Sequence, residues 1–303
     1  ISPSFTPKRL QELSGLIRER AGDILDNLPR NEDFNWVREV SVELTGQMLA
    51  TIFGVPQEDR DKLIHWSDTV ERLGDPDYFE TPEEGFKELW RCFEYFDAVW
   101  KDRQAAKDQG TDLISTLVNG EATKNMLPNE FLGNMLLLIV GGNDTTRNSI
   151  SGGVLALNQN QDEYNKLCNN HALIPKMVPE IIRWQTPLAH MRRTATQDYL
   201  LRDQLIRQGD MVIMWYLSGN RDPEAIADPD EFIIDRKRPR EHLSFGFGLH
   251  RCLGNRLAEM QLRVLWEEIL NRCPRIKVTG EIVRASSPLF RAIQAMPVKF
   301  DTA

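Results

Sequence analysis

The chain has 303 residues, of which 41% are hydrophobic and 27% charged, and its formal net charge is -8 at pH 7. This composition predicts a globular protein, and the acidic balance argues against general affinity for nucleic acid or an anionic membrane. The longest clean apolar run, residues 135–140, is too short to cross a bilayer. The first ten residues lack the apolar core of a signal peptide, so we expect no membrane span and a cytoplasmic location.

Helical periodicity dominates the chain. Apolar residues recur at three-and-four spacing over residues 10–28 and again over residues 86–100, which predicts two amphipathic helices. A third helix begins near Pro128 and is apolar on most faces at its centre, as a helix buried inside a domain would be. A fourth follows Pro175, and a fifth opens at Cys252.

Between the fourth and fifth helices, the tripeptide at residues 208–210 separates two runs rich in apolar and β-prone residues and predicts a turn. We therefore expect a mainly α fold with a small β component. No internal repeat or compositional break marks a linker, so residues 1–303 are predicted to form a single domain.

The four cysteines are scattered, and none forms a close pair such as C-x-x-C. Neither a structural zinc site nor a disulfide framework is therefore indicated, and we expect reduced thiols. Cys252 differs from the others because glycines lie on both sides of it. A cysteine needed only for packing would lie within an apolar stripe, without such turns.

The segment around this cysteine reads FGFGLHRCLG, from Phe245 to Gly254. Its first two glycines permit tight backbone conformations. At the start of a helix, backbone N–H groups and the helix dipole lower a thiol pKa, which makes Cys252 a candidate metal ligand or nucleophile. Nucleophilic catalysis needs a separate base, and His250 is too near in sequence to reach back to the sulfur. The ligand interpretation is the better one.

This segment resembles the haem-binding loop F-G-x-G-x-H-x-C-x-G of the cytochromes P-450. The resemblance implies haem b (iron protoporphyrin IX) with the Cys252 thiolate as axial ligand of the iron. It also implies that His250 contacts a haem propionate and that Phe245 packs beside the thiolate. Gly246 and Gly254 belong to the same motif.

Two further matches support this resemblance. Glu180 and Arg183 fit the E-x-x-R motif of the family, although that spacing alone is more often a surface pair. Arg236, in DPDEFIIDR, supplies the third member of a buried network that would hold the core behind the thiolate loop. Arg193 matches the arginine that pairs with a haem propionate, whereas its neighbour Arg192 is kept out of the site.

The central helix carries GGNDTT, which fits the family motif [AG]-G-x-[DE]-T. The resemblance implies that Thr145 is the alcohol and Asp144 the acid that assist O₂ activation and proton relay. Each glycine inside a helix costs about 1 kcal/mol relative to alanine. Gly141 and Gly142 therefore have a purpose, which is either close helix packing or an opening for O₂, and the two do not exclude each other.

Several longer stretches, among them EIIRWQTPLAHMRRTA and PDEFIIDRKRPREHLSFGFGLHRCLG, resemble the soluble bacterial P-450 family that hydroxylates terminal carbons of medium-chain alkanes. Apolar residues near the motifs would suit such a substrate, though they would equally suit a core. The candidates are Leu138, Leu188, Leu289 and Phe290. The amino-terminal ISPSFTPKRL resembles the stretch after the third major helix of the family, so we expect the P-450 fold to lack roughly its first quarter.

The electrons must come from outside, because the sequence has neither a dinucleotide-binding fingerprint nor an iron–sulfur cysteine motif. The resemblance implies a ferredoxin and an NAD(P)H-dependent ferredoxin reductase as partners. Arg251, Arg256 and the cluster Lys237, Arg238 and Arg240 are candidates for docking an acidic ferredoxin, although such charges are more often a solvated face. The alternatives are a haem-binding sensor or carrier, a peroxide-driven peroxygenase and a cysteine hydrolase.

Overall fold

The structure is a computed structural model that describes residues 5–73, 75, 77–106, 110–273 and 275–300. The α-helices are α1 (Pro7–Asp26), α2 (Glu43–Phe53), α3 (Arg60–Glu71), α4 (Pro82–Ala106), α5 (Leu113–Asn119), α6 (Pro128–Gln159), α7 (Gln161–Asn169), α8 (Ile174–Gln185), α9 (Tyr216–Gly219) and α10 (Asn255–Arg272). Shorter helical turns are η2 (Val37–Val42), η3 (Gln57–Asp59), η4 (His171–Leu173) and η5 (Gly248–His250). The strands are β1 (Phe34–Asn35), β2 (His190–Thr194), β3 (Tyr199–Leu201), β4 (Gln204–Ile206), β5 (Met211–Trp215), β6 (Ile276–Val278), β7 (Val283–Arg284), β8 (Ile293–Ala295) and β9 (Pro297–Phe300).

All five predicted helices are present. The first covers Pro7–Asp26 and so ends two residues before the apolar periodicity does. Pro7 and Pro128 lie at the first helical positions of α1 and α6, where the missing N–H costs nothing. The fifth helix begins at Asn255 with Gly254 as its cap, so Cys252 precedes the helix and does not open it as predicted.

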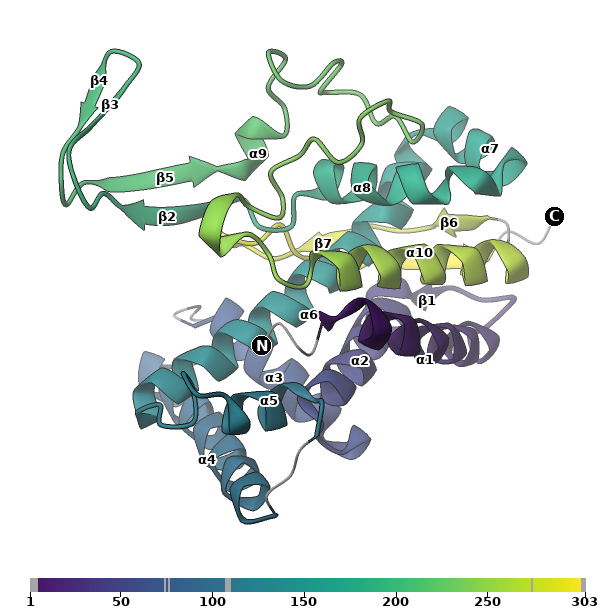
Figure 1. Cartoon of the computed structure of the whole chain (residues 1–303). Helices are drawn as coiled ribbons and strands as arrows, with labels where there is room; N and C mark the ends of the chain where they lie inside the picture. The colour runs from purple at the N-terminus through teal and green to yellow at the C-terminus, as the bar shows by residue number, and fades with distance from the viewer. Residues whose placement is uncertain (1–4, 74, 76, 107–109, 274, 301–303) are drawn as a thin grey trace.

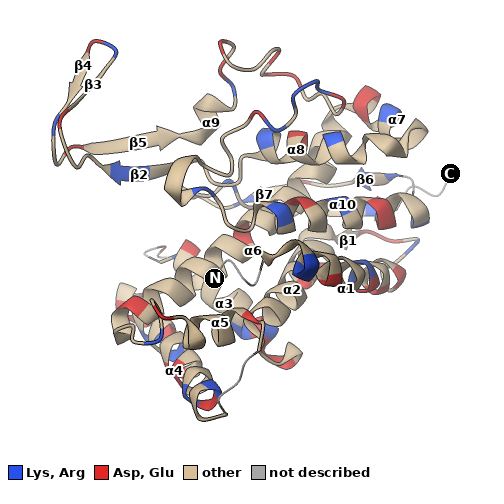
Figure 2. Ribbon diagram, in the orientation of Figure 1, with Lys and Arg blue, Asp and Glu red and all other residues tan. Residues whose placement is uncertain are grey.

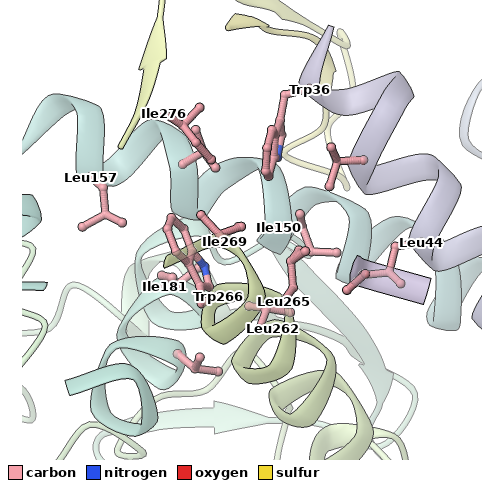
Figure 3. Close-up of a cluster of buried hydrophobic side chains, with 14 of the residues drawn as sticks. Trp36, Leu44, Ile150, Leu157, Ile181, Leu262, Leu265, Trp266, Ile269 and Ile276 are labelled. Atoms are coloured by element: carbon pink, nitrogen blue, oxygen red, sulfur yellow. The ribbon is translucent and has the colours of Figure 1, made fainter. Parts of the chain in front are cut away.

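Helix α6 lies at the centre of the molecule and packs against α2, α3, α8 and α10 (Figure 1). Almost every residue from Asn143 to Leu157 is buried, which confirms the predicted buried helix. Figure 3 shows Ile150 of this helix in the same buried apolar cluster as Trp36, Ile181 of α8 and Trp266 of α10. Burying each such side chain contributes about 1.5–3 kcal/mol or more to folding.

A second apolar cluster packs on the amino-terminal half of α6. It contains Leu49 and Phe53 of α2, Trp66 of α3, Phe96 of α4 and Ile139 of α6 itself. In Figure 1, helices α3, α4 and α5 lie below this half of α6. The two halves of α6 therefore stand in different surroundings, and the GGNDTT segment lies where they meet.

The strands form small antiparallel sheets. Strands β1, β9 and β6 form one three-stranded sheet, while β2 pairs with β5, β3 with β4 and β7 with β8. The β2–β5 pair runs from His190 opposite Trp215 to Thr194 opposite Met211, and it extends away from the helices in Figure 1. The predicted turn is present, with Gly209 at φ 90°.

Among the described helices, none combines the length and apolar character that a transmembrane span requires.

Candidate active site

The segment from Phe245 to Gly254 forms a tight loop that closes on itself. Gly246 and Gly248 have φ of 66° and 77°, a left-handed conformation that residues with a side chain rarely adopt. A Cβ added at Gly246 would lie 3.1 Å from the hydroxyl of Tyr216. The backbone N–H of Cys252 donates to the carbonyl of Phe245 at 2.8 Å. The glycines predicted to shape this loop therefore do so by their backbone conformation.

Cys252 is an exposed residue that follows the half-buried start of this loop. Atoms of the loop still crowd its sulfur, and this withdrawal from water raises the pKa of the thiol. The backbone N–H groups of Gly254 and Asn255 and the charge of Arg251 act in the opposite direction and only partly offset it. The predicted lowering of the pKa is therefore wrong for the free thiol. A coordinating metal ion reverses this balance, because it deprotonates the thiol outright.

One face of α6 is exposed and almost free of large polar groups. Leu137, in the amino-terminal half of this long helix, is 67% exposed, and Gly141 follows it one turn later. A Cβ added at Gly141 would meet nothing within 4 Å, whereas one at Gly142 would lie 3.0 Å from Cδ1 of Leu49. Gly142 thus serves close packing and Gly141 leaves open space. The Thr145 hydroxyl, on the same face, donates to the Gly141 carbonyl at 2.8 Å.

Asp144 lies on another face of α6 and is fully buried against α3. Its carboxylate accepts from the hydroxyl of Ser67 at 2.8 Å and from the guanidinium of Arg147 at 2.5 Å. Burial raises the pKa of this carboxyl to about 6, against the opposing effects of Arg147 and Ser67. In this arrangement the acid and the alcohol of the motif point to different neighbours.

The sequence analysis missed the residues that hold Asp144. Arg147 is 7% exposed, and Ser67 is fully buried. One signal was available, because a charged residue three positions after Asp144 falls on the same helical face inside a buried run. No comparable signal marks Ser67, which lies far away in the sequence.

Two donors predicted to hold propionates lie on exposed segments. Arg193 is half-buried on β2 opposite Val212, and its guanidinium donates to the Arg192 carbonyl at 2.9 Å. In Figure 2 part of the β2 ribbon is blue, the colour of Lys and Arg. His250 is exposed at the end of η5. Within the described part of the chain, no carboxylate oxygen lies within 4.0 Å of either side chain.

Glu180, Arg183 and Arg236 are brought together in the core. Nε and a terminal nitrogen of Arg183 each donate to the Glu180 carboxylate at 2.8 Å, and Nε of Arg236 donates to it at 3.0 Å. Arg183 also donates to the carbonyls of Asn220, Pro229 and Glu231. This network fastens α8 to the segment that leads into the thiolate loop.

The candidate substrate residues separate into two places. Leu188 and Phe290 form an isolated antiparallel bridge, and the N–H of Ala189 donates to the Leu289 carbonyl at 2.8 Å. Phe290 is buried, while Leu188 and Leu289 are half-buried. Leu138 instead packs against the second apolar cluster, at the amino-terminal half of α6. Three of the four candidates are therefore neighbours, and Leu138 lies with a different cluster.

These surfaces fit a haem. The described part of the chain leaves Phe247 and Leu249 of the loop largely uncovered, as it does Leu137 of α6. A flat apolar macrocycle would cover such groups, its iron would take the exposed Cys252 sulfur, and its anionic propionates would match Arg193 and His250. Each donor type that this cofactor requires is therefore present.

The sequence profile of the cytochrome P-450 family matches residues 75–278. The chain belongs to the cytochrome P-450 family, whose members are haem-thiolate monooxygenases that receive electrons from redox partners.

Solved structures resemble the chain in fold and sequence. Cytochrome P-450-153 from Novosphingobium aromaticivorans is 44% identical with a TM-score of 0.91, and the match covers 99% of this chain and 73% of that one. CYP153D17 from Sphingomonas sp. PAMC 26605 is also 44% identical, with a TM-score of 0.92 and coverage of 99% and 75%. These matches confirm the predicted fold class and the similarity to the alkane-hydroxylase P-450 family. The chain thus spans about three quarters of the length of these two proteins.

Curated relatives hydroxylate different molecules. Linalool 8-monooxygenase of Pseudomonas putida is 33% identical over 98% of this chain and 73% of its own length. Methyl-branched lipid omega-hydroxylase of Mycobacterium tuberculosis is 34% identical, with coverage of 98% and 70%. The reaction class is therefore shared, whereas the substrate varies among relatives.

Proposed function

We propose that this monooxygenase hydroxylates the terminal carbon of medium-chain n-alkanes or similar apolar chains, and that residues 1–303 form one catalytic domain. The observation that carries the proposal is the 44% identity over 99% of the chain to cytochrome P-450-153, together with the resemblance of the motif stretches to the alkane-hydroxylase family. The omega-hydroxylase among the relatives adds support, because its name places its reaction at a chain end.

Bound through Cys252, the haem supplies the chemistry that activates O₂. The chain's own residues bind the haem and form its surroundings. The N–H groups of Gly254 and Asn255 hydrogen-bond the Cys252 sulfur, and Arg193 and His250 provide donors for the propionates. Gly141 leaves room for a small molecule on the exposed face of α6.

Proton control falls to the acid and alcohol of α6. Thr145 can turn its hydroxyl from the Gly141 carbonyl toward a small molecule on this exposed face, because the carbonyl keeps its helical partner. Asp144, buried and with a raised pKa, can hold a proton near neutral pH and release it. Leu188 and Leu289 offer an apolar wall that excludes water from the reacting C–H bond.

We assign the electron supply to a ferredoxin and its NAD(P)H-dependent reductase. Of the basic residues predicted to dock them, Arg238 is paired with Glu241 at 3.0 Å and Arg240 with Glu259 at 2.7 Å. Those two charges are therefore largely neutralised by neighbours. Arg251 and Arg256, next to the thiolate loop, are the better candidates for steering an acidic partner. The predicted cytoplasmic location stays a prediction.

Incubation of the haem-loaded enzyme with n-octane, a ferredoxin, its reductase and NADH is expected to yield 1-octanol in excess over 2-octanol. Gas chromatography of the extract measures both alcohols, and a reaction without ferredoxin is the control. Conversion of linalool but not octane would contradict terminal alkane hydroxylation while leaving the monooxygenase class intact. Equal product from hydrogen peroxide without ferredoxin would favour the peroxygenase alternative.

Thr145→Ala is expected to lower product formation by about 10²-fold, the smaller end of what general acid–base groups contribute. Oxygen consumption should then appear as hydrogen peroxide instead of alcohol. Thr145→Ser is the matched control, because it keeps the hydroxyl that donates to Gly141, and it should stay within a few-fold of the parent. Unchanged product yield in the alanine variant would show that the hydroxyl has no part in oxygen chemistry.

A further inference from the structure

Helix α3 places two acidic residues, Asp68 and Glu71, next to Asp144 of α6. On α3, Glu71 follows Ser67 by four residues and Asp68 by three, so its side chain lies next to both on the helix surface. Oxygen atoms of Asp68, Glu71 and Asp144 all lie within 4.8 Å of one another. Arg147 joins the three, with guanidinium nitrogens 2.8 Å from Asp68, 3.2 Å from Glu71 and 2.5 Å from Asp144. Three carboxyls therefore surround one buried cation.

Glu71 differs from the other two acids in its hydrogen bonding. Its side chain is 5% exposed, and only Oε2 accepts from Arg147. Among the described residues, Oε1 has no hydrogen-bond partner. A buried carboxylate oxygen without a donor costs free energy, and a proton on that oxygen removes the charge that makes the cost large.

We propose that Glu71 is a positioning residue that keeps a proton in this buried cluster and passes it to Asp144. The proposal rests on the monooxygenase function proposed above, because it concerns the acid that this function uses. It adds a residue of α3 to the proton path, and the path then runs from solvent through Asp68 and Glu71 to α6.

The charges around Glu71 favour a bound proton at neutral pH. Burial is the largest cause, followed by the charge of Asp144, and together they raise the pKa of Glu71 to about 7 against the effect of Arg147. On the same helix as Glu71, the charge of Asp68 also raises the pKa of Glu71, and the charge of Arg72 lowers it. Arg72 is also committed to Asp75 at 3.2 Å. On α4, Glu88 is paired with His65 and Arg91 and so contributes little net charge.

Asp68 gives this cluster an exit to water. Its side chain is 33% exposed, while those of Glu71 and Arg147 are 5% and 8% exposed. The step balances as a proton transfer. The O–H bond of Glu71 breaks and a new O–H bond forms on Asp144. The Glu71 carboxylate then takes a proton from the Asp68 carboxyl, which is reprotonated by hydronium from the solvent. Because the oxygens of the three acids lie within 4.8 Å of one another, rotation of the Glu71 side chain can bring its carboxyl into hydrogen-bond contact with that of Asp144.

The first test reads protonation without turnover. Glu71→Gln keeps the size of the side chain and cannot ionise, and Asp61→Asn changes an exposed acid on the same helix as the control. A raised pKa means that the folded state holds the proton more tightly, so its stabilisation is present below the usual glutamate pKa and is lost as pH rises through about 7. Urea midpoints of the parent should fall between pH 5 and 8, and Glu71→Gln should flatten that fall.

Infrared spectra give a second readout of the same kind. The protonated-carboxyl C=O band of the parent at pH 6 should lose intensity in Glu71→Gln and persist in Asp61→Asn. If the band and the slope of stability against pH are both unchanged in Glu71→Gln, Glu71 is ionised and the proposal is wrong. This result does not depend on the substrate, so it stays separate from failure of the octane reaction.

The second test measures proton supply in the haem-loaded enzyme. Glu71→Gln is expected to lower kcat for octane about tenfold with little change in KM, and to remove the decline of activity as pH rises above about 7. Glu71→Asp restores an ionisable group and should recover part of kcat. Loss of kcat equally in the glutamine and aspartate variants, with an unaltered pH profile, would mean that Glu71 supports the fold and does not move protons.

Discussion

Cys252→Ser is expected to remove the thiolate-type red-shifted Soret band of the reduced carbon monoxide complex, and hydroxylation with it. A serine hydroxyl is a far weaker donor to iron than a thiolate, and no other described cysteine lies in a glycine-flanked loop. The fold should persist, because serine replaces only the sulfur of an exposed residue by a smaller oxygen, and substitutions at exposed positions usually cost about 0.5 kcal/mol or less. The carbon monoxide difference spectrum and the urea midpoint measure the two effects.

Cys168→Ser is the matched control for this change, since it replaces a half-buried cysteine on α7. It should leave both the band and the activity intact. Retention of the red-shifted band in Cys252→Ser would identify another ligand and overturn the assignment of the loop. Hydrolytic activity in the absence of haem, lost in Cys252→Ser, would instead favour the cysteine hydrolase alternative. Cys252 would then be the nucleophile.

Local patterns in the sequence were enough to predict the elements on which the site is built. The buried character of α6 follows from its apolar centre, and the loop conformation follows from Gly246 and Gly248, because only local backbone sterics are involved. Both features depend on residues close to one another along the chain. That is why periodicity and glycine spacing found them before any contact was known.

Features that depend on distant residues were not predictable in this way. Ser67 and Glu71 reach Asp144 only because α3 packs across α6, and nothing in the sequence of α3 marks its polar face as facing another acid. The prediction of a lowered thiol pKa for Cys252 was wrong for a related reason. The helix start favours the thiolate, but crowding by the folded loop acts the other way, and only the three-dimensional arrangement decides the balance.

Glu180→Ala is expected to lower the free energy of unfolding by about 3–5 kcal/mol, the range observed when one partner of a buried ion pair is removed. Glu180 and Arg183 are almost completely buried, and the change leaves Arg183 and Arg236 facing each other without their shared anion. Urea unfolding at pH 7 followed by circular dichroism measures the loss. Glu12→Ala, which breaks an exposed pair with Arg9, should cost less than about 1 kcal/mol.

The same change should weaken haem retention, and this consequence separates the network from an ordinary core contact. Arg183 also donates to the carbonyls of Asn220, Pro229 and Glu231, and the side chain of Asn220 donates to Ser244 at 2.8 Å, one residue before the loop motif. Greater mobility of the Arg183 side chain would therefore also increase the mobility of the loop that contains Cys252. Haem transfer to apomyoglobin should be faster in Glu180→Ala than in Glu12→Ala. A loss of stability below 1 kcal/mol would show that the carbonyl acceptors alone hold Arg183, and the ion pair would then have no structural role.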